Sequence, residues 1–157
     1  MALIIAAMAL CACQTKELTP EQSALDRVLI ADASYAKTST TFAQVVTSAE
    51  TTNLAGCPKN FVSAFQDGVA AWKKMADIEK QMYALDRARA MSDIKDFLGE
   101  YSTNPLNAII VLKKKWPQFA QQLDKAFGEL REAFTKYTLL ASEQGVAYPA
   151  ASGMFNF

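Results

Sequence analysis

The sequence has 157 residues, of which 51% are hydrophobic, and this length is sufficient for one domain with a buried core. Its 16 Lys and Arg residues balance 16 Asp and Glu residues, so the chain lacks the basic excess of nucleic-acid-binding proteins, and we expect no nucleic-acid partner. It contains no histidine, the commonest general base and metal ligand, and we therefore expect no enzymatic activity, cofactor or metal.

An apolar run at residues 1–10 opens the chain. It is about half as long as a membrane-spanning helix requires, and it fits the hydrophobic region of a secretory signal. No Lys or Arg precedes it, although secretory signals usually begin with a positive charge. A buried N-terminal helix is the alternative interpretation, but it gives no reason for the two cysteines and the polar segment that follow.

The segment Leu10-Cys11-Ala12-Cys13 resembles the lipobox of bacterial lipoproteins, in which a leucine stands three residues before the lipidated cysteine. The resemblance implies a signal peptide at residues 1–12, a lipid on Cys13 and attachment to a membrane of the bacterial envelope. Gln14 follows, and because no aspartate occupies that position, the resemblance implies the outer membrane, facing the periplasm. It covers this motif alone, and no domain family is recognised in the rest of the chain.

Processing of this kind would leave residues 13–18 as a tether, residues 19–157 as a single domain, and Cys57 as its one unmodified cysteine. A lone cysteine cannot form an internal disulfide, but it can link two copies of the chain in a homodimer. Cys57 precedes Pro58, which suits the start of a helix. The helix dipole and Lys59 are then expected to lower the thiol pKa and make Cys57 reactive. A capping or packing role is the alternative.

The first helix is predicted over residues 20–50. Thr19 can cap it, Pro20 suits the first position, and Gln22 completes a capping box. The run at residues 37–41 is rich in hydroxyl and β-branched residues, which predicts a weak or bent middle. A turn at residues 51–56 follows.

The second helix begins at Pro58 and fades between Arg87 and Met91, after which Ser92 or Asp93 is expected to cap a short helix that ends at Gly99. Gly68 lies close to the apolar stripe of the second helix, and this indicates close approach by another helix, with Phe or Trp filling the space.

Pro105 starts a segment that ends in three lysines at residues 113–115, which either neutralise the carboxyl end of a helix or contact anionic headgroups. The last helix is predicted from Pro117 to Gly145, where a glycine can adopt a left-handed conformation. Residues 146–157 are too apolar to be simply solvated, and we expect them to fold back over the bundle. The apolar positions of the last helix recur at steps of three and four and predict one buried stripe: Ala120, Leu123, Phe127, Leu130, Phe134, Tyr137 and Ala141.

These elements predict an all-α fold, an antiparallel four-helix bundle with a broken third helix. Asp32 and Glu79 interrupt or adjoin apolar stripes, and we expect each to pair with Lys or Arg across a helix seam. The sequence contains no catalytic constellation, which favours a non-enzymatic envelope lipoprotein that binds another protein or has a structural role. Two alternatives stay open: a redox protein that uses Cys57, and a binder of small apolar ligands held among the core aromatics Phe61, Phe65, Trp72, Phe127 and Phe134.

Overall fold

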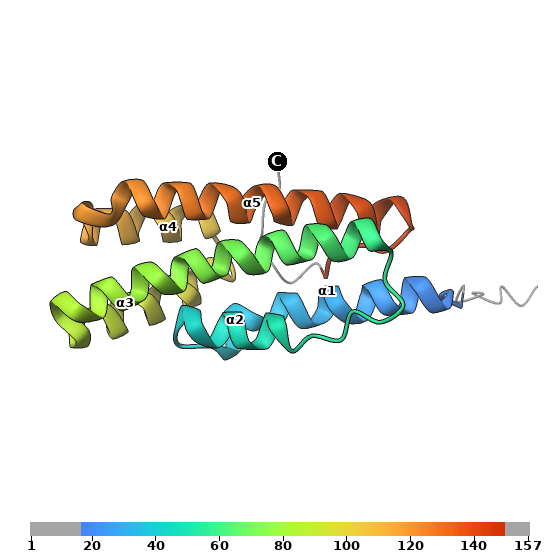
Figure 1. The fold of residues 1–157 in the computed structure, drawn as a ribbon, viewed down its shortest axis with the longest axis horizontal. Coiled ribbons are helices and arrows are strands. Elements are labelled where there is room, and N and C mark those ends of the chain that lie inside the picture. The colour runs from blue at the N-terminus through green and yellow to red at the C-terminus, as the bar shows by residue number, and fades with distance from the viewer. Residues whose placement is uncertain (1–16, 150–157) are drawn as a thin grey trace, which may run out of the picture.

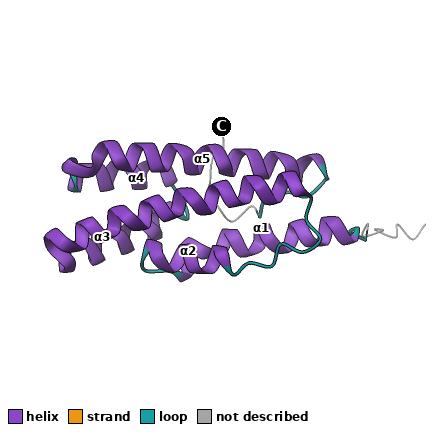
Figure 2. Ribbon diagram, in the orientation of Figure 1, coloured by secondary structure: helices purple, strands orange, loops and turns teal. Residues whose placement is uncertain are grey.

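The computed structural model describes residues 17–149, and within this range the chain is helical, with no strand. Figures 1 and 2 show an elongated bundle of helices that lie roughly side by side. The predicted all-α fold is therefore confirmed. None of the helices from α1 to α5 is both long and apolar enough to cross a membrane. The lipobox, Cys13 and the last eight residues, 150–157, lie outside the described residues.

Helix α1 (Pro20–Thr38) begins as predicted, since Thr19 and Gln22 form a reciprocal capping box. A single helix over residues 20–50 is not formed. The chain breaks at residues 39–41, and Thr41 accepts a hydrogen bond from the Gln44 backbone to cap a separate helix, α2 (Phe42–Glu50).

Helix α2 runs back along α1 (Figure 1). The Tyr35 hydroxyl hydrogen-bonds the Thr52 hydroxyl, and the Arg27 guanidinium donates to the Ala55 carbonyl at 2.9 Å. These contacts join the middle and end of α1 to the segment that follows α2, which is only compatible with a reversal between the two helices. The predicted weak point was thus in the right place, but it produces a turn rather than a bend.

Helix α3 (Lys59–Tyr101) contains a second reversal, at Asp86, whose φ of −153° and ψ of 94° are not helical. The rings of Trp72 and Tyr101 have centroids 5.3 Å apart, whereas a straight helix would separate these residues by roughly 44 Å. Helix α3 therefore consists of a first leg (residues 59–85) and an antiparallel second leg (residues 87–101). Asp86 itself caps the second leg, because its carboxylate accepts a hydrogen bond from the Arg89 backbone at 3.0 Å.

The predicted positions of this break were wrong by several residues. No new helix starts at Ser92 or Asp93, and the helix does not end at Gly99 but continues to Tyr101. Residues 87–91, where the helix was expected to fade, instead form the start of the second leg, and Asp86, the residue before them, caps it.

Helix α4 (Pro105–Lys115) follows a short turn and is capped by Asn104, whose side chain accepts from the Asn107 backbone. Trp116 ends α4 with φ −130° and ψ 65°, and a short 3-10 turn, η1 (Pro117–Phe119), follows. Helix α5 (Ala120–Glu143) then runs along most of the length of the molecule (Figure 1). Gly145 has a φ of 78°, as predicted for the end of this helix. All members of the predicted stripe except the half-buried Ala120 are buried.

Helix α3 has its most extensive contact with α5, and Gly68 of the first leg lies in that contact. A Cβ atom placed on Gly68 would lie 3.6 Å from the Tyr137 ring and 3.7 Å from the Ala133 methyl group. The predicted close approach at Gly68 is confirmed, although a tyrosine, not a phenylalanine or tryptophan, fills the space. The start of the C-terminal tail also folds back as expected, since Val146 is buried and the Tyr148 ring lies 5.0 Å from that of Phe134.

Candidate functional site

Cys57 lies just before α3 and is partly buried. The expected low thiol pKa is wrong: burial raises the pKa of Cys57, and the nearby Arg27 offsets this only in part. Pro58 occupies the capping position of α3, and no side chain caps that helix. The thiol is thus a poorer nucleophile than an unperturbed cysteine, and the redox alternative loses the low pKa on which it depended.

The five aromatic residues considered as a ligand site are all buried core residues. Phe61 packs on Phe65 and Tyr137, Trp72 packs on Tyr101, and Phe127 also packs on Tyr101. The cavity that Trp72 and Tyr101 border has a volume of about 10 Å³, room for about one water molecule. The rings fill the interior themselves, which favours a packing role over the binding of an apolar ligand.

Asp32 on α1 is the centre of a hydrogen-bonded cluster that joins three parts of the chain. Its Oδ2 atom accepts hydrogen bonds from the hydroxyl groups of Tyr137, on α5, and Tyr148, in the tail, each at 2.8 Å. Burial raises the pKa of Asp32 from 3.8 to about 6, and the two hydrogen bonds oppose the shift without cancelling it. The expectation that Asp32 pairs with Lys or Arg is therefore wrong; its partners are neutral phenols.

Glu79, on the first leg of α3, is also buried without the predicted cation. Its carboxylate accepts a hydrogen bond from the Ala43 backbone at 3.1 Å and another from the Tyr83 hydroxyl. It thereby binds the amino end of α2, where backbone N–H groups lack partners within the helix and the helix dipole favours a carboxylate. Glu79 fixes α2 against α3, which is a structural role.

Asp93, on the second leg of α3, is the centre of a third cluster, and here the partners of the carboxylate include cations. Lys115 Nζ lies 2.8 Å from Asp93 Oδ1, while Oδ2 accepts from Trp116 Nε1 at 2.9 Å and lies 3.6 Å from Arg89 Nε. Arg89 also stacks over the Trp116 ring and donates to the Lys115 carbonyl. The cluster ties the second leg to the end of α4, where the chain turns toward α5.

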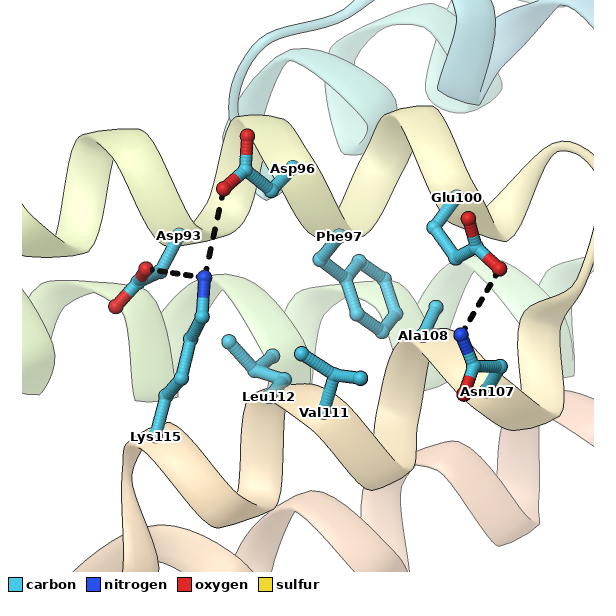
Figure 3. A pocket seen from close by; sticks show the side chains of 9 residues that line it. All are labelled: Asp93, Asp96, Phe97, Glu100, Asn107, Ala108, Val111, Leu112 and Lys115. Atoms are coloured by element: carbon cyan, nitrogen blue, oxygen red, sulfur yellow. Dashed lines mark hydrogen bonds and ion pairs between the residues drawn. The ribbon is translucent and has the colours of Figure 1, made fainter.

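Between the second leg and α4 lies an open groove with a volume of about 220 Å³ (Figure 3). The side chains of Phe97, Ala108 and Leu112 form its floor and are almost fully buried. Its rim carries carboxylates from the second leg and, from α4, Asn107, Val111 and Lys115.

The charges of the groove are unequal at its two ends. At one end Lys115 pairs with Asp93 and lies 3.4 Å from Asp96, whereas at the other Glu100 accepts a hydrogen bond from the neutral amide of Asn107 at 3.0 Å. Of the residues described around this groove, three are carboxylates and one, Lys115, is a cation. The groove is thus apolar at its floor and acidic at its rim.

Sequence reasoning did not identify this groove. A usable signal was present, since acids recur at positions 93, 96 and 100, the spacing of one helix face. Residues 113–115 lie in the last turn of α4, as the interpretation of cations at a helix end requires, and Lys113 pairs with Asp124 and Lys115 with Asp93. Residues 17–149 include no group of three His, Cys, Asp or Glu side chains arranged to hold a metal ion.

Comparison of the chain with protein-family models, with curated proteins and with solved structures finds no match. No domain family is recognised, in agreement with the sequence analysis. The groove between the second leg of α3 and α4 is the candidate functional site, because it combines a buried apolar floor with three carboxylates at its rim.

Proposed function

We propose that this chain is a lipid-anchored lipoprotein of the bacterial envelope whose helical domain is a non-enzymatic, protein-binding module. The observation that carries the proposal is the lipobox-like segment ending at Cys13, followed almost at once by Thr19, the capping residue of the folded domain. A lipid on Cys13 would hold the bundle close to the bilayer surface. Gln14 favours the outer membrane, facing the periplasm.

Protein binding is supported by the surface rather than by any reactive group. The carboxylates of the half-buried Asp32 and the buried Glu79 and Asp93 are occupied by hydrogen bonds and ion pairs within the fold. The groove beside α4, in contrast, leaves Val111 and the carboxylate of Asp96 exposed to solvent. Exposed apolar side chains next to polar groups are typical of surfaces that contact another protein.

The test is a Cys13→Ala variant of the full chain, expressed in a bacterium and compared with a Cys57→Ala control. We expect the wild type and the control to fractionate with membranes and to carry a diacylglycerol-type mass on the N-terminal peptide. Cys13→Ala should lack that mass and lose membrane attachment through the lipid. Equal membrane recovery and equal N-terminal masses for wild type and Cys13→Ala would contradict the proposal.

A further inference from the structure

Exposed apolar side chains concentrate on α4. Eight large hydrophobic residues are exposed in the part of the chain that the structure describes, and three of them, Leu106, Ile110 and Val111, lie on this one short helix. Leu106 and Ile110, four residues apart, project from the same face of α4, whereas Val111 points about 100° away from Ile110 and lies on the groove rim. Single exposed apolar residues are ordinary, but Val111 adjoins the buried floor of the groove, and an apolar floor that continues to an exposed apolar side chain indicates a contact surface.

The charge on the side of the groove opposite α4 restricts what can bind in the groove. Asp96 and Glu100 project from the second leg of α3 across from α4 (Figure 3). Asp96 shares Lys115 with Asp93, and Lys115 Nζ lies 3.4 Å from Asp96 but only 2.8 Å from Asp93. Glu100 accepts its hydrogen bond from the neutral amide of Asn107. A covering molecule that brings positive charge is attracted by this rim, whereas an anionic lipid surface is repelled.

We propose that the groove binds a segment of another envelope protein, which inserts an apolar side chain between the second leg of α3 and α4 and places Lys or Arg beside Asp96 and Glu100. This inference rests on the proposed function and names the partner chemistry. The groove volume of about 220 Å³ suits one or two large side chains and is smaller than most small-molecule pockets, which also favours a peptide segment.

The experiment places a photo-crosslinking amino acid at position 111 of the full chain in the producing bacterium, and in a second strain at position 107 on the same rim. Position 30, an exposed apolar site on α1, is the control. The crosslinked peptide is then sequenced by mass spectrometry. We expect an adduct from position 111 or 107, and not from 30, with a peptide that contains apolar residues flanked by Lys or Arg.

A charge variant gives the second readout. Asp96→Asn combined with Glu100→Gln should reduce the adduct yield roughly tenfold, because two attractive charges are removed. The matched control, Asp67→Asn combined with Glu143→Gln, changes the net charge equally at exposed sites outside the groove and should leave the yield unchanged. Circular dichroism of both variants checks that the helical fold is retained.

Several results would overturn the proposal: no adduct from 111 and 107, an adduct only with lipid or with a second copy of this chain, a crosslinked peptide without cations, or a yield insensitive to Asp96→Asn and Glu100→Gln. Lipidation of Cys13 is measured separately from the N-terminal mass. A lipidated protein that crosslinks to a partner from position 30 alone would retain the proposed function and exclude the groove as its site.

Discussion

The half-buried Asp32 and the buried Asp93 both join segments that are distant in sequence, yet their partners differ in kind. Asp32 accepts hydrogen bonds from two neutral tyrosine hydroxyls, on α5 and in the C-terminal tail. Asp93 is surrounded by the ammonium group of Lys115, the guanidinium of Arg89 and the indole N–H of Trp116.

The two aspartates show how a helical bundle can place a carboxylate in its interior in two ways. Phenols donate hydrogen bonds but carry no charge, so they offset the loss of hydration only in part, and burial raises the pKa of Asp32 to about 6. Cations offset that loss by direct attraction, and the hydrogen bond to Asp93 in turn raises the pKa of Lys115. We therefore expect the contribution of Asp32 to the free energy of unfolding to change with pH, and the contribution of Asp93 to depend on the negative charge of its carboxylate.

The largest expected effect comes from removing the aromatic packing around the Asp32 cluster. Phe134 packs edge-on against both tyrosines of that cluster, Tyr137 and Tyr148, and is buried. Phe134→Ala should lower the free energy of unfolding by about 3–5 kcal/mol, measured by urea denaturation, because it leaves a cavity between α5 and the tail. Leu139→Ala, at an exposed position on α5, is the control and should cost less than about 0.5 kcal/mol. Equal losses in the two variants would refute the core assignment of Phe134.

The same amide substitution should affect the two aspartates differently at pH 7. Asp93→Asn removes a charge from between two cations and directs an N–H group toward other donors, so we expect a loss of about 2–3 kcal/mol in the free energy of unfolding. Asp32→Asn retains an oxygen that can accept from both tyrosines and removes a poorly solvated charge, so its effect should stay within about 1 kcal/mol. If Asp32→Asn proved the more damaging of the two in urea titrations, the contrast between the clusters would be refuted.

The pH dependence sharpens the comparison further. Because the folded-state pKa of Asp32 lies above its ordinary value, its contribution to stability is fully present below about pH 3.8 and is lost as the pH rises through about 6. The wild type should therefore gain about 1–2 kcal/mol relative to Asp32→Asn when the pH falls from 7.5 to 4.5. Urea denaturation at several pH values measures this difference, and parallel pH profiles for the two proteins would show that Asp32 does not titrate in this range.

Local patterns in the sequence were sufficient to predict most of the helices. The capping box at Thr19, the buried stripe of α5 and the break before Pro117 depend on residues close together in the chain, and each is present in the structure. The close approach at Gly68 was also predictable, because a glycine costs stability in a helix interior and is tolerated on an apolar face where a neighbouring helix packs closely against it.

The reversals of direction were less accessible to sequence reasoning. Residues 83–90 contain neither glycine nor proline, and the break at Asp86 is stabilised by the packing of the second leg, including Phe97 against Phe42 of α2. Such a contact joins residues that are far apart in the chain, so no local periodicity indicates it. The same reason explains why the thiol pKa of Cys57 was predicted in the wrong direction, since burial outweighed the local helix dipole.

By itself, the sequence determined that this chain is helical, where its caps and stripes lie, and which aromatic residues form the core, because those properties follow from the spacing of neighbouring residues. Only the tertiary structure decided that two of the expected helices double back, that Asp32 meets tyrosines while Asp93 meets cations, and that α4 and the second leg of α3 enclose an acidic groove. Those features arise from side chains brought together by packing across the bundle, and their energies depend on burial and on partners that no single segment contains.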